Sequence, residues 1–258
     1  MPDSGQKSTS SDLEDLDRLF LAPSGWVSSK REQRPVSCDG TALPWFTFGA
    51  IEFLNQIIWA EASVFEYGAG YSTLWWQCVV NSVISVDHDP QWLLELQPKL
   101  QKHALVELVQ ENATVPEIAK PLISRFMARP RRTIWNYETA KVIRRGLEDE
   151  QFYGYAARIL EYKKCFDFVV IDGMARRLCA EFAVNCVSEK GVIILDNSNR
   201  RDYDAAFDIL NEAGFKQIPF WGLVPGANFL TCTSFFVRSL NVLPDGSHKP
   251  NTFDLPEY

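Results

Sequence analysis

Short apolar runs rich in β-branched and aromatic residues alternate along the chain with longer stretches in which apolar residues recur at helical spacing. The apolar runs predict strands at residues 63–67, 83–87, 105–109, 166–171, 191–196, 216–220 and 230–237. The periodic stretches predict helices at residues 71–80, 90–101, 174–188 and 202–213, the last two ending before Gly191 and Gly214. This alternation predicts an α/β fold around a largely parallel sheet.

The pattern also divides the chain into a central domain and appended segments. Residues 1–11 are polar and are expected to form a disordered tail, and residues 12–62 are expected to form an N-terminal helical extension. The predicted domain covers residues 63–240, and residues 241–258 are expected to form a C-terminal tail.

The connection between the third and fourth predicted strands is too long for an ordinary crossover. Residues 114–165 contain two helical stretches, near residues 116–128 and 138–163, and predict a helical lid or insertion. Across residues 125–145, only Glu138 opposes a set of cations made up of Arg125, Arg129, Arg131, Arg132, Lys141, Arg144 and Arg145. These cations either form a solvated helical surface or recruit an anionic substrate, because arginines pair well with carboxylates and phosphates.

Composition and charge narrow the expected partners. The formal net charge of −7 and the pI of about 5.1 argue against a nucleic-acid-binding protein, which needs a basic surface. No apolar run is long enough for a membrane-spanning helix, so we expect no membrane partner, and the polar first residues lack a signal-peptide core. The six cysteines have no metal-like spacing, which favours reduced thiols in a cytoplasmic protein.

The strongest chemical signal lies between residues 64 and 73. Glu66 closes a buried strand, and Gly68 and Gly70 form a turn that lets a ligand approach the backbone closely. The next predicted helix begins with Ser72 and Thr73, whose main-chain N–H groups and hydroxyls suit a carboxylate or phosphate.

A second acid ends the following predicted strand. Asp87 stands 17 residues after Gly70. A glycine turn followed by an acid at the end of the next strand is an arrangement that holds a nucleoside ligand by its ribose. We therefore expect a nucleoside-containing ligand at this edge of the sheet.

Polar residues end the later strands as well. After the segment Glu66-Tyr67-Gly68-Ala69-Gly70 and Asp87 come Asn112 behind the third strand, Asp172 behind the fourth and Asp196-Asn197 behind the fifth. In order and spacing these residues resemble the motifs of class I S-adenosylmethionine (SAM)-dependent methyltransferases, over roughly residues 60–238. Within that class they look closest to FkbM-like and catechol-O-methyltransferase-like enzymes. The resemblance implies a Rossmann-like three-layer sandwich with a mostly parallel seven-stranded sheet, an antiparallel last strand and a helical insertion.

The resemblance also implies how SAM would lie. The carboxylate of SAM suits Ser72 and Thr73, and its ribose diol suits Asp87. The adenine would lie between His88 and Asn112, with the methionine portion near Asp172. The implied cofactor-binding residues are Glu66, Gly68, Ala69, Gly70, Ser72, Thr73, Asp87, His88, Asn112 and Asp172.

A metal is one possibility that the resemblance raises. Catechol-type enzymes hold a divalent cation with an aspartate after the fourth strand and an Asp-Asn pair after the fifth. Asp172, Asp196 and Asn197 keep these residue types, which suit Mg²⁺. Two departures oppose the metal: the glycine turn is two residues shorter, and Ala175 replaces an expected basic residue.

The alternative to a metal is a general base among the chain's own side chains. The implied catalytic residues are Asp172 and Asp196, and Tyr153 or Tyr155 of the insertion could take the same role. A further set of aromatic residues either walls a substrate pocket or packs in the core; it comprises Trp45, Phe46, Phe48 and Trp221.

The favoured function is a SAM-dependent methyltransferase that transfers a methyl group to oxygen or nitrogen of a small-molecule acceptor, which the basic insertion suggests is anionic. One alternative is an NAD(P)-dependent oxidoreductase, although its fingerprint needs a third glycine where Thr73 stands. Another is a non-catalytic SAM-binding module. An antiparallel hairpin of residues 216–220 with 230–237 would favour the methyltransferase sheet over the dinucleotide-binding one.

Overall fold

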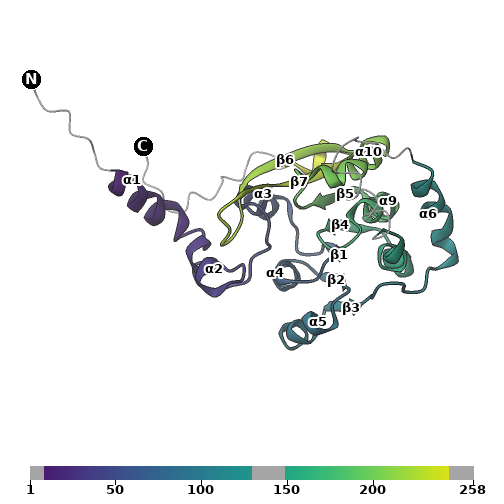
Figure 1. The fold of residues 1–258 in the computed structure, drawn as a ribbon, viewed down its shortest axis with the longest axis horizontal. Coiled ribbons are helices and arrows are strands. Elements are labelled where there is room, and N and C mark those ends of the chain that lie inside the picture. The colour runs from purple at the N-terminus through teal and green to yellow at the C-terminus, as the bar shows by residue number, and fades with distance from the viewer. Residues whose placement is uncertain (1–8, 130–148, 244–258) are drawn as a thin grey trace, which may run out of the picture.

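The computed structural model describes residues 9–129 and 149–243, and at its centre lies a seven-stranded sheet (Figure 1). The strands are β1 (Ser63–Tyr67), β2 (Ser82–Asp87), β3 (Ala104–Leu108), β4 (Phe166–Ile171), β5 (Val187–Leu195), β6 (Lys216–Leu223) and β7 (Leu230–Val237). They lie in the order β3-β2-β1-β4-β5-β7-β6. Successive strands therefore run outward from β1 in one direction and from β4 in the other, and the order reverses between β1 and β4.

The first five strands are parallel, and the last two form an antiparallel hairpin. β4 pairs in parallel with β1 and β5, whereas β7 runs antiparallel between β5 and β6. The pairing of β6 with β7 extends from Lys216 opposite Val237 to Leu223 opposite Leu230. The structure thus confirms the predicted Rossmann-like fold, including its antiparallel last strand.

Among the described residues, alternation of side chains along the central strands produces two large apolar clusters, one on each face of the sheet, beside a small third cluster around Leu74 and Leu96. Phe65 and Val169 belong to one cluster, together with residues of α8 (Tyr153–Ala157), α9 (Arg176–Cys186) and α10 (Asp204–Glu212). Val64 and Phe168 belong to the other, together with residues of α3 (Phe48–Ile57) and α4 (Tyr71–Val79). In Figure 1, α4 and α9 accordingly lie on opposite sides of the central strands. Among the described residues, no helix is long and apolar enough to span a bilayer.

Within residues 9–62, three α-helices precede the first strand. They are α1 (Thr9–Leu16), followed by a π-helical turn (Asp17–Leu21), then α2 (Trp26–Glu32) and α3. α1 begins at Thr9, three residues inside the segment expected to be a tail, and residues 1–8 lie outside the described part. At the other end, a 3₁₀-helix (Leu240–Val242) lies at the start of the predicted C-terminal tail, whose residues 244–258 also lie outside the described part.

The described parts of the connection from β3 to β4 are mainly helical, as predicted, whereas residues 130–148, which include the start of the predicted helical stretch 138–163, lie outside the described residues. It contains a 3₁₀-helix (Glu117–Ala119), α6 (Lys120–Met127), α8 and a second 3₁₀-helix (Arg158–Tyr162). Arg125 and Arg129 both contact Glu181 of α9, and Arg129 Nη1 lies 2.6 Å from Glu212 Oε2 of α10. For these two arginines, the contacts support a structural role over recruitment of substrate. The remaining predicted cations and Glu138 lie outside the described residues: Arg131, Arg132, Lys141, Arg144 and Arg145.

Candidate active site

A cavity of about 460 Å³ lies at the carboxyl ends of β1, β2 and β4. In open α/β sheets, ligands bind at this edge where the strand order reverses, because the loops leave the sheet in opposite directions there. The reversal here falls between β1 and β4. Seven of the predicted site residues line this cavity: Gly68, Ala69, Gly70, Ser72, Asp87, His88 and Asp172.

The glycine turn after β1 forms the floor of the cavity. Gly68 has a φ of +98°, and a Cβ at this position would lie 2.7 Å from the main-chain nitrogen of Gly173. The loops after β1 and β4 therefore touch backbone to backbone, which only glycine allows at this φ. A Cβ at Gly70 would meet nothing closer than 3.9 Å, so the missing side chain leaves space for a ligand.

Asp87 at the end of β2 is a fixed hydrogen-bond acceptor. Its Oδ1 accepts from the main-chain N–H groups of His88 and Asp89 at 2.7 and 2.9 Å. Burial raises the pKa of the Asp87 carboxyl, whereas these N–H groups and the His88 imidazole oppose that shift. The carboxylate lines the cavity in one orientation, as recognition of a diol requires.

Glu66 and Thr73 lie behind the cavity wall instead of lining it. Both are fully buried, and the Thr73 hydroxyl donates to Glu66 Oε2, which also accepts from Ser85 Oγ at 2.7 Å. Thr73 Oγ1 in turn accepts from the main-chain N–H of Gly70 at 2.9 Å. Burial raises the pKa of Glu66 to about 7, and the neighbouring hydroxyls oppose the shift. These two residues therefore fix the glycine turn through hydrogen bonds on its buried side.

Asn112 lies apart from the other predicted cofactor residues. It is exposed, has a left-handed φ of 58° and is not part of the cavity lining. Its main-chain N–H donates to the carbonyl oxygen of Gln151 at 2.7 Å, which joins the loop after β3 to the insertion.

The two predicted catalytic aspartates have different surroundings. Asp172 lines the cavity, and its Oδ1 lies 2.7 Å from Arg176 Nη2. Asp196 is only 3% exposed, and its oxygens accept from Thr233 Oγ1 and Asn197 Nδ2, both at 2.7 Å. Burial raises the pKa of Asp196 to about 7, with the Asp172 charge adding to the shift. Of the pair, only Asp172 faces the cavity.

The Mg²⁺ hypothesis does not fit these side chains. Asp172 is paired with a guanidinium, and both oxygens of Asp196 accept protein hydrogen bonds. Across residues 9–129 and 149–243, no group of three or more His, Cys, Asp or Glu side chains is placed to hold a metal ion.

Tyr155 does not line the cavity either. Its ring is fully buried, and its hydroxyl donates to the Val86 carbonyl oxygen at 3.3 Å. Burial raises the pKa of this phenol well above its usual value, which disfavours a role as general base. Tyr153 is partly buried against the same apolar cluster. The described residues of the insertion thus pack against the loop after β4 without lining the cavity: a Cβ on Gly173 would clash with the Tyr155 hydroxyl oxygen.

An N-terminal strap, residues 26–47, forms a cavity wall of which the sequence analysis named only Trp45. It contributes Gln33, Arg34, Pro35 and Trp45 to the lining. The indole N–H groups of Trp26 and Trp45 donate to the carbonyl oxygens of Ala227 and Pro225, at 2.7 and 2.8 Å. The strap is therefore fastened to the loop between β6 and β7.

Of the predicted aromatic wall, only Trp45 is in place. Phe46 is fully buried in the core, and Phe48 packs against the same core cluster. Trp221 on β6 is 64% exposed and is not part of the lining. The opposite wall comes from Met174 and from Arg200 and Tyr203, which follow β5.

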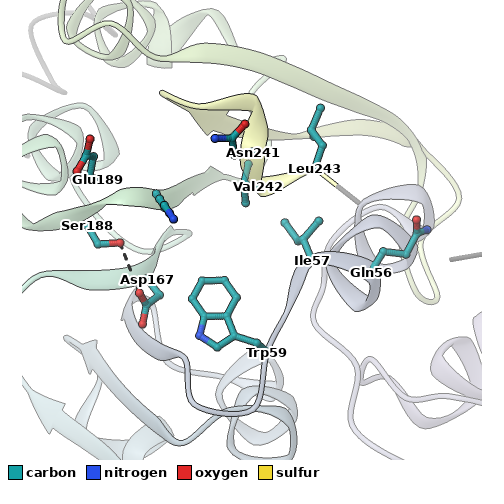
Figure 2. A pocket seen from close by; sticks show the side chains of 10 residues that line it. Gln56, Ile57, Trp59, Asp167, Ser188, Glu189, Asn241, Val242 and Leu243 are labelled. Atoms are coloured by element: carbon teal, nitrogen blue, oxygen red, sulfur yellow. Dashed lines mark hydrogen bonds between the residues drawn. The ribbon is translucent and has the colours of Figure 1, made fainter. Parts of the chain in front are cut away.

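A second cavity, of about 550 Å³, lies at the amino ends of β4 and β5 (Figure 2). Asp167, which lines it, accepts from the main-chain N–H of Ser63 at 2.9 Å. It also accepts from Ser188 Oγ, the bond that Figure 2 marks. None of the predicted site residues lines this cavity. The candidate site is therefore the cavity at the carboxyl edge.

Comparison with known proteins gives similarity in fold only. No protein-family model matches the chain, and a search of curated protein sequences gives no match. A putative O-methyltransferase from Klebsiella pneumoniae is 12% identical over 91% of this chain and 99% of that one, with a TM-score of 0.44. The precorrin-6y C5,15-methyltransferase from Geobacter metallireducens GS-15 is 11% identical over 74% and 87%, with a TM-score of 0.45. The N-methyltransferase NodS from Bradyrhizobium japonicum WM9, solved with S-adenosyl-L-homocysteine, is 13% identical over 83% and 98%, with a TM-score of 0.42.

Proposed function

We propose that this protein is a SAM-dependent methyltransferase that acts on oxygen or nitrogen of a small-molecule acceptor. One observation carries the proposal: the Gly68–Gly70 turn and the Asp87 carboxylate line one cavity at the point where the strand order reverses. A nucleoside cofactor needs both a close approach to the backbone and an acceptor for its ribose diol.

The residues of the cavity fit SAM on two further counts. Gly70 leaves open the space that a side chain would fill, next to Ser72 at the start of α4. The free main-chain N–H groups of this nine-residue helix suit the carboxylate of the cofactor. Asp87, held by two main-chain N–H groups, would accept from the ribose hydroxyls.

The protein's own part in the reaction is to bind, orient and exclude water. When bound, SAM supplies a methyl group on positive sulfur; the acceptor heteroatom bonds to this carbon, the carbon–sulfur electron pair stays on sulfur, and the acceptor's proton is released. Asp172 is the carboxylate that we assign to receive this proton, since it faces the cavity and Asp196 does not. Arg176 holds the Asp172 carboxylate in its orientation.

Two observations weigh against an NAD(P)-dependent oxidoreductase. The sheet ends in an antiparallel hairpin, with β7 between β5 and β6, whereas the dinucleotide-binding order continues with parallel strands. The position of the third fingerprint glycine is occupied by Thr73, whose hydroxyl is bound to Glu66.

Calorimetric titration with SAM, S-adenosylhomocysteine and NAD⁺ tests the proposal. We expect micromolar binding of the first two and none of NAD⁺, and the Asp87→Asn variant should bind S-adenosylhomocysteine at least about tenfold more weakly. Glu95→Gln, an exposed acid on α5 (Pro90–Leu96), is the control and should bind like the parent protein. Binding of NAD⁺ alone would overturn the proposal, and undiminished binding by Asp87→Asn would overturn the ribose assignment. Binding of SAM with no methyl transfer to any acceptor would favour the non-catalytic module.

A further inference from the structure

Arg200 places an unpaired positive charge at the wall of the cavity. It lies in the loop between β5 and α10 and is exposed. Within the described part of the chain, its guanidinium forms no hydrogen bond and no ion pair. Burial raises the pKa of the Asp172 carboxyl, and Arg200 opposes this rise only at longer range. The other two arginines of the lining do have carboxylate partners, Glu32 for Arg34 and Asp172 for Arg176.

Planar side chains line the same cavity as this cation. Trp45 of the strap is 51% exposed, and its indole N–H is fixed by the Pro225 carbonyl oxygen. Across from the strap, the ring of Tyr203 has the Arg176 guanidinium 5.2 Å from its centroid. The cavity thus offers flat apolar surface on the strap and one unpaired cation on the wall across from it.

The charges of the residues that line the cavity favour an anionic ligand beside Arg200. Asp87 and Asp172 are the only carboxylates of the described lining, and they are held by the main chain and by Arg176, respectively. A positively charged sulfonium cofactor in the same cavity would be repelled by the Arg200 guanidinium. An anion bound between the two would remove this repulsion and would pair with a guanidinium, which binds carboxylates well.

We propose that the methyl acceptor is a small aromatic carboxylic acid, whose carboxylate pairs with Arg200 and whose ring lies against Trp45. This inference rests on the proposed function, because it takes the glycine-turn side of the cavity as the cofactor's. It does not use the cations of the insertion, since Arg125 and Arg129 are bound to Glu181. The acceptor is recognised by the loop after β5 and by the strap.

Titration of the complex with S-adenosylhomocysteine tests the inference without requiring turnover. The probes are benzoate, 4-hydroxybenzoate and cinnamate, each compared with its primary amide, which keeps the shape and removes the charge. We expect at least about tenfold tighter binding of the acids to the parent protein. Arg200→Gln should reduce this preference to about twofold or less, whereas Arg200→Lys should keep part of it.

Arg201→Gln is the matched control. Arg201 is the next residue and begins a 3₁₀-helix (Arg201–Tyr203); it is exposed and does not line the cavity, so this variant should keep the full preference for acids. Equal binding of acids and amides, or no binding of either, would overturn the inference. It would also be overturned if Arg200→Gln kept the preference, or if that variant lost affinity for S-adenosylhomocysteine itself, since Arg200 would then hold the cofactor's carboxylate. If the parent protein does not bind S-adenosylhomocysteine at all, the proposed function fails first.

Discussion

Arg176 binds Asp172 through both the side chain and the main chain of the aspartate. Its Nη2 lies 2.7 Å from Asp172 Oδ1 and also donates to the Asp172 carbonyl oxygen. Its other nitrogens donate to the carbonyl oxygens of Asp196 at 2.7 Å and Gly173 at 3.1 Å. One side chain thus joins the loop after β4 to the end of β5 beside the cavity.

Replacing Arg176 by methionine should destabilise the protein strongly. The variant keeps a long side chain but leaves the mostly buried Asp172 carboxylate without its partner, so we expect the free energy of unfolding to fall by about 3–5 kcal/mol. Urea denaturation at pH 7 measures this loss. The double variant Asp172→Asn with Arg176→Met is the control and should recover part of the stability, because an amide needs no counter-ion. A loss below about 1 kcal/mol in Arg176→Met would contradict this account.

Glu66 should make stability depend on pH. The ordinary pKa of glutamate is 4.5, and burial raises it to about 7 here. Between these values, the unfolded chain loses the proton while the folded protein keeps it, so the free energy of unfolding falls as pH rises from about 4.5 to 7. The difference in pKa corresponds to about 3 kcal/mol in total.

Urea denaturation from pH 4.5 to pH 8, for the parent protein and for Glu66→Gln, isolates this effect. Asp196 also titrates with a pKa raised to about 7, so only the difference between the two proteins reports on Glu66. The glutamine variant should lose a large part of the slope, whereas Glu95→Gln should keep it. Parallel profiles for the parent and Glu66→Gln would mean that Glu66 is ionised in the folded protein throughout this range.

Alanine substitutions at the two glycines of the turn should differ in their effect on stability. Gly68→Ala should lower the free energy of unfolding by about 2–4 kcal/mol, because it combines a left-handed φ with a contact of 2.7 Å to backbone. Gly70→Ala should change stability by less than about 1 kcal/mol, since its extended φ of −175° suits any residue.

The same two variants should differ in ligand binding. Gly70→Ala places a methyl group in the cavity and should weaken binding of S-adenosylhomocysteine by at least about tenfold while the protein stays folded. Thermal denaturation and calorimetry of each variant separate the two effects. A Gly70→Ala protein that binds like the parent would show that no ligand approaches the backbone at this turn.

The strap should loosen when its indole hydrogen bonds are removed. Trp26→Phe and Trp45→Phe each delete one N–H group that donates to the loop between β6 and β7, at a cost of about 1 kcal/mol each. Amide hydrogen exchange over residues 26–47 should become faster in both variants. Trp59→Phe removes an indole from the opposite edge of the sheet and is the control. Unchanged exchange in both strap variants would show that these bonds do not hold the segment.

The strands and the polar residues that end them could be predicted from sequence because both signals are local. A run such as residues 166–171 must be buried on both faces of a sheet, and Asp172 follows it directly. Parallel pairing then brings Asp172 to the same edge as Gly68 without further information. The seven strands, the glycine turn and Asp87 follow from such local signals, whereas His88 was implied only by the resemblance to known methyltransferases.

Contacts between distant segments could not be predicted in this way. Trp45 donates to Pro225, and Arg34 donates to Tyr71, because the strap folds back over the domain. Neither the sequence of the strap nor the sequences around Pro225 and Tyr71 indicate these contacts. Gly191 was expected to end a helix, but β5 already begins at Val187, and a register shift in its pairing with β4 accommodates the extra residues. The sequence predicts that the Thr73 hydroxyl binds a ligand, but in the structure this hydroxyl donates to Glu66. Local sequence does not indicate that the two side chains meet.

The fastening of the strap has a consequence for how this protein can diverge. Both indole N–H groups donate to main-chain carbonyl oxygens, at Pro225 and Ala227, and every amino acid supplies that acceptor. Mutations in the loop can therefore accumulate without cutting the anchor, provided that its backbone keeps its path. A change in the path of this loop would shift Trp45, and with it one wall of the cavity, while the glycine turn and Asp87 would keep the positions that β1 and β2 give them.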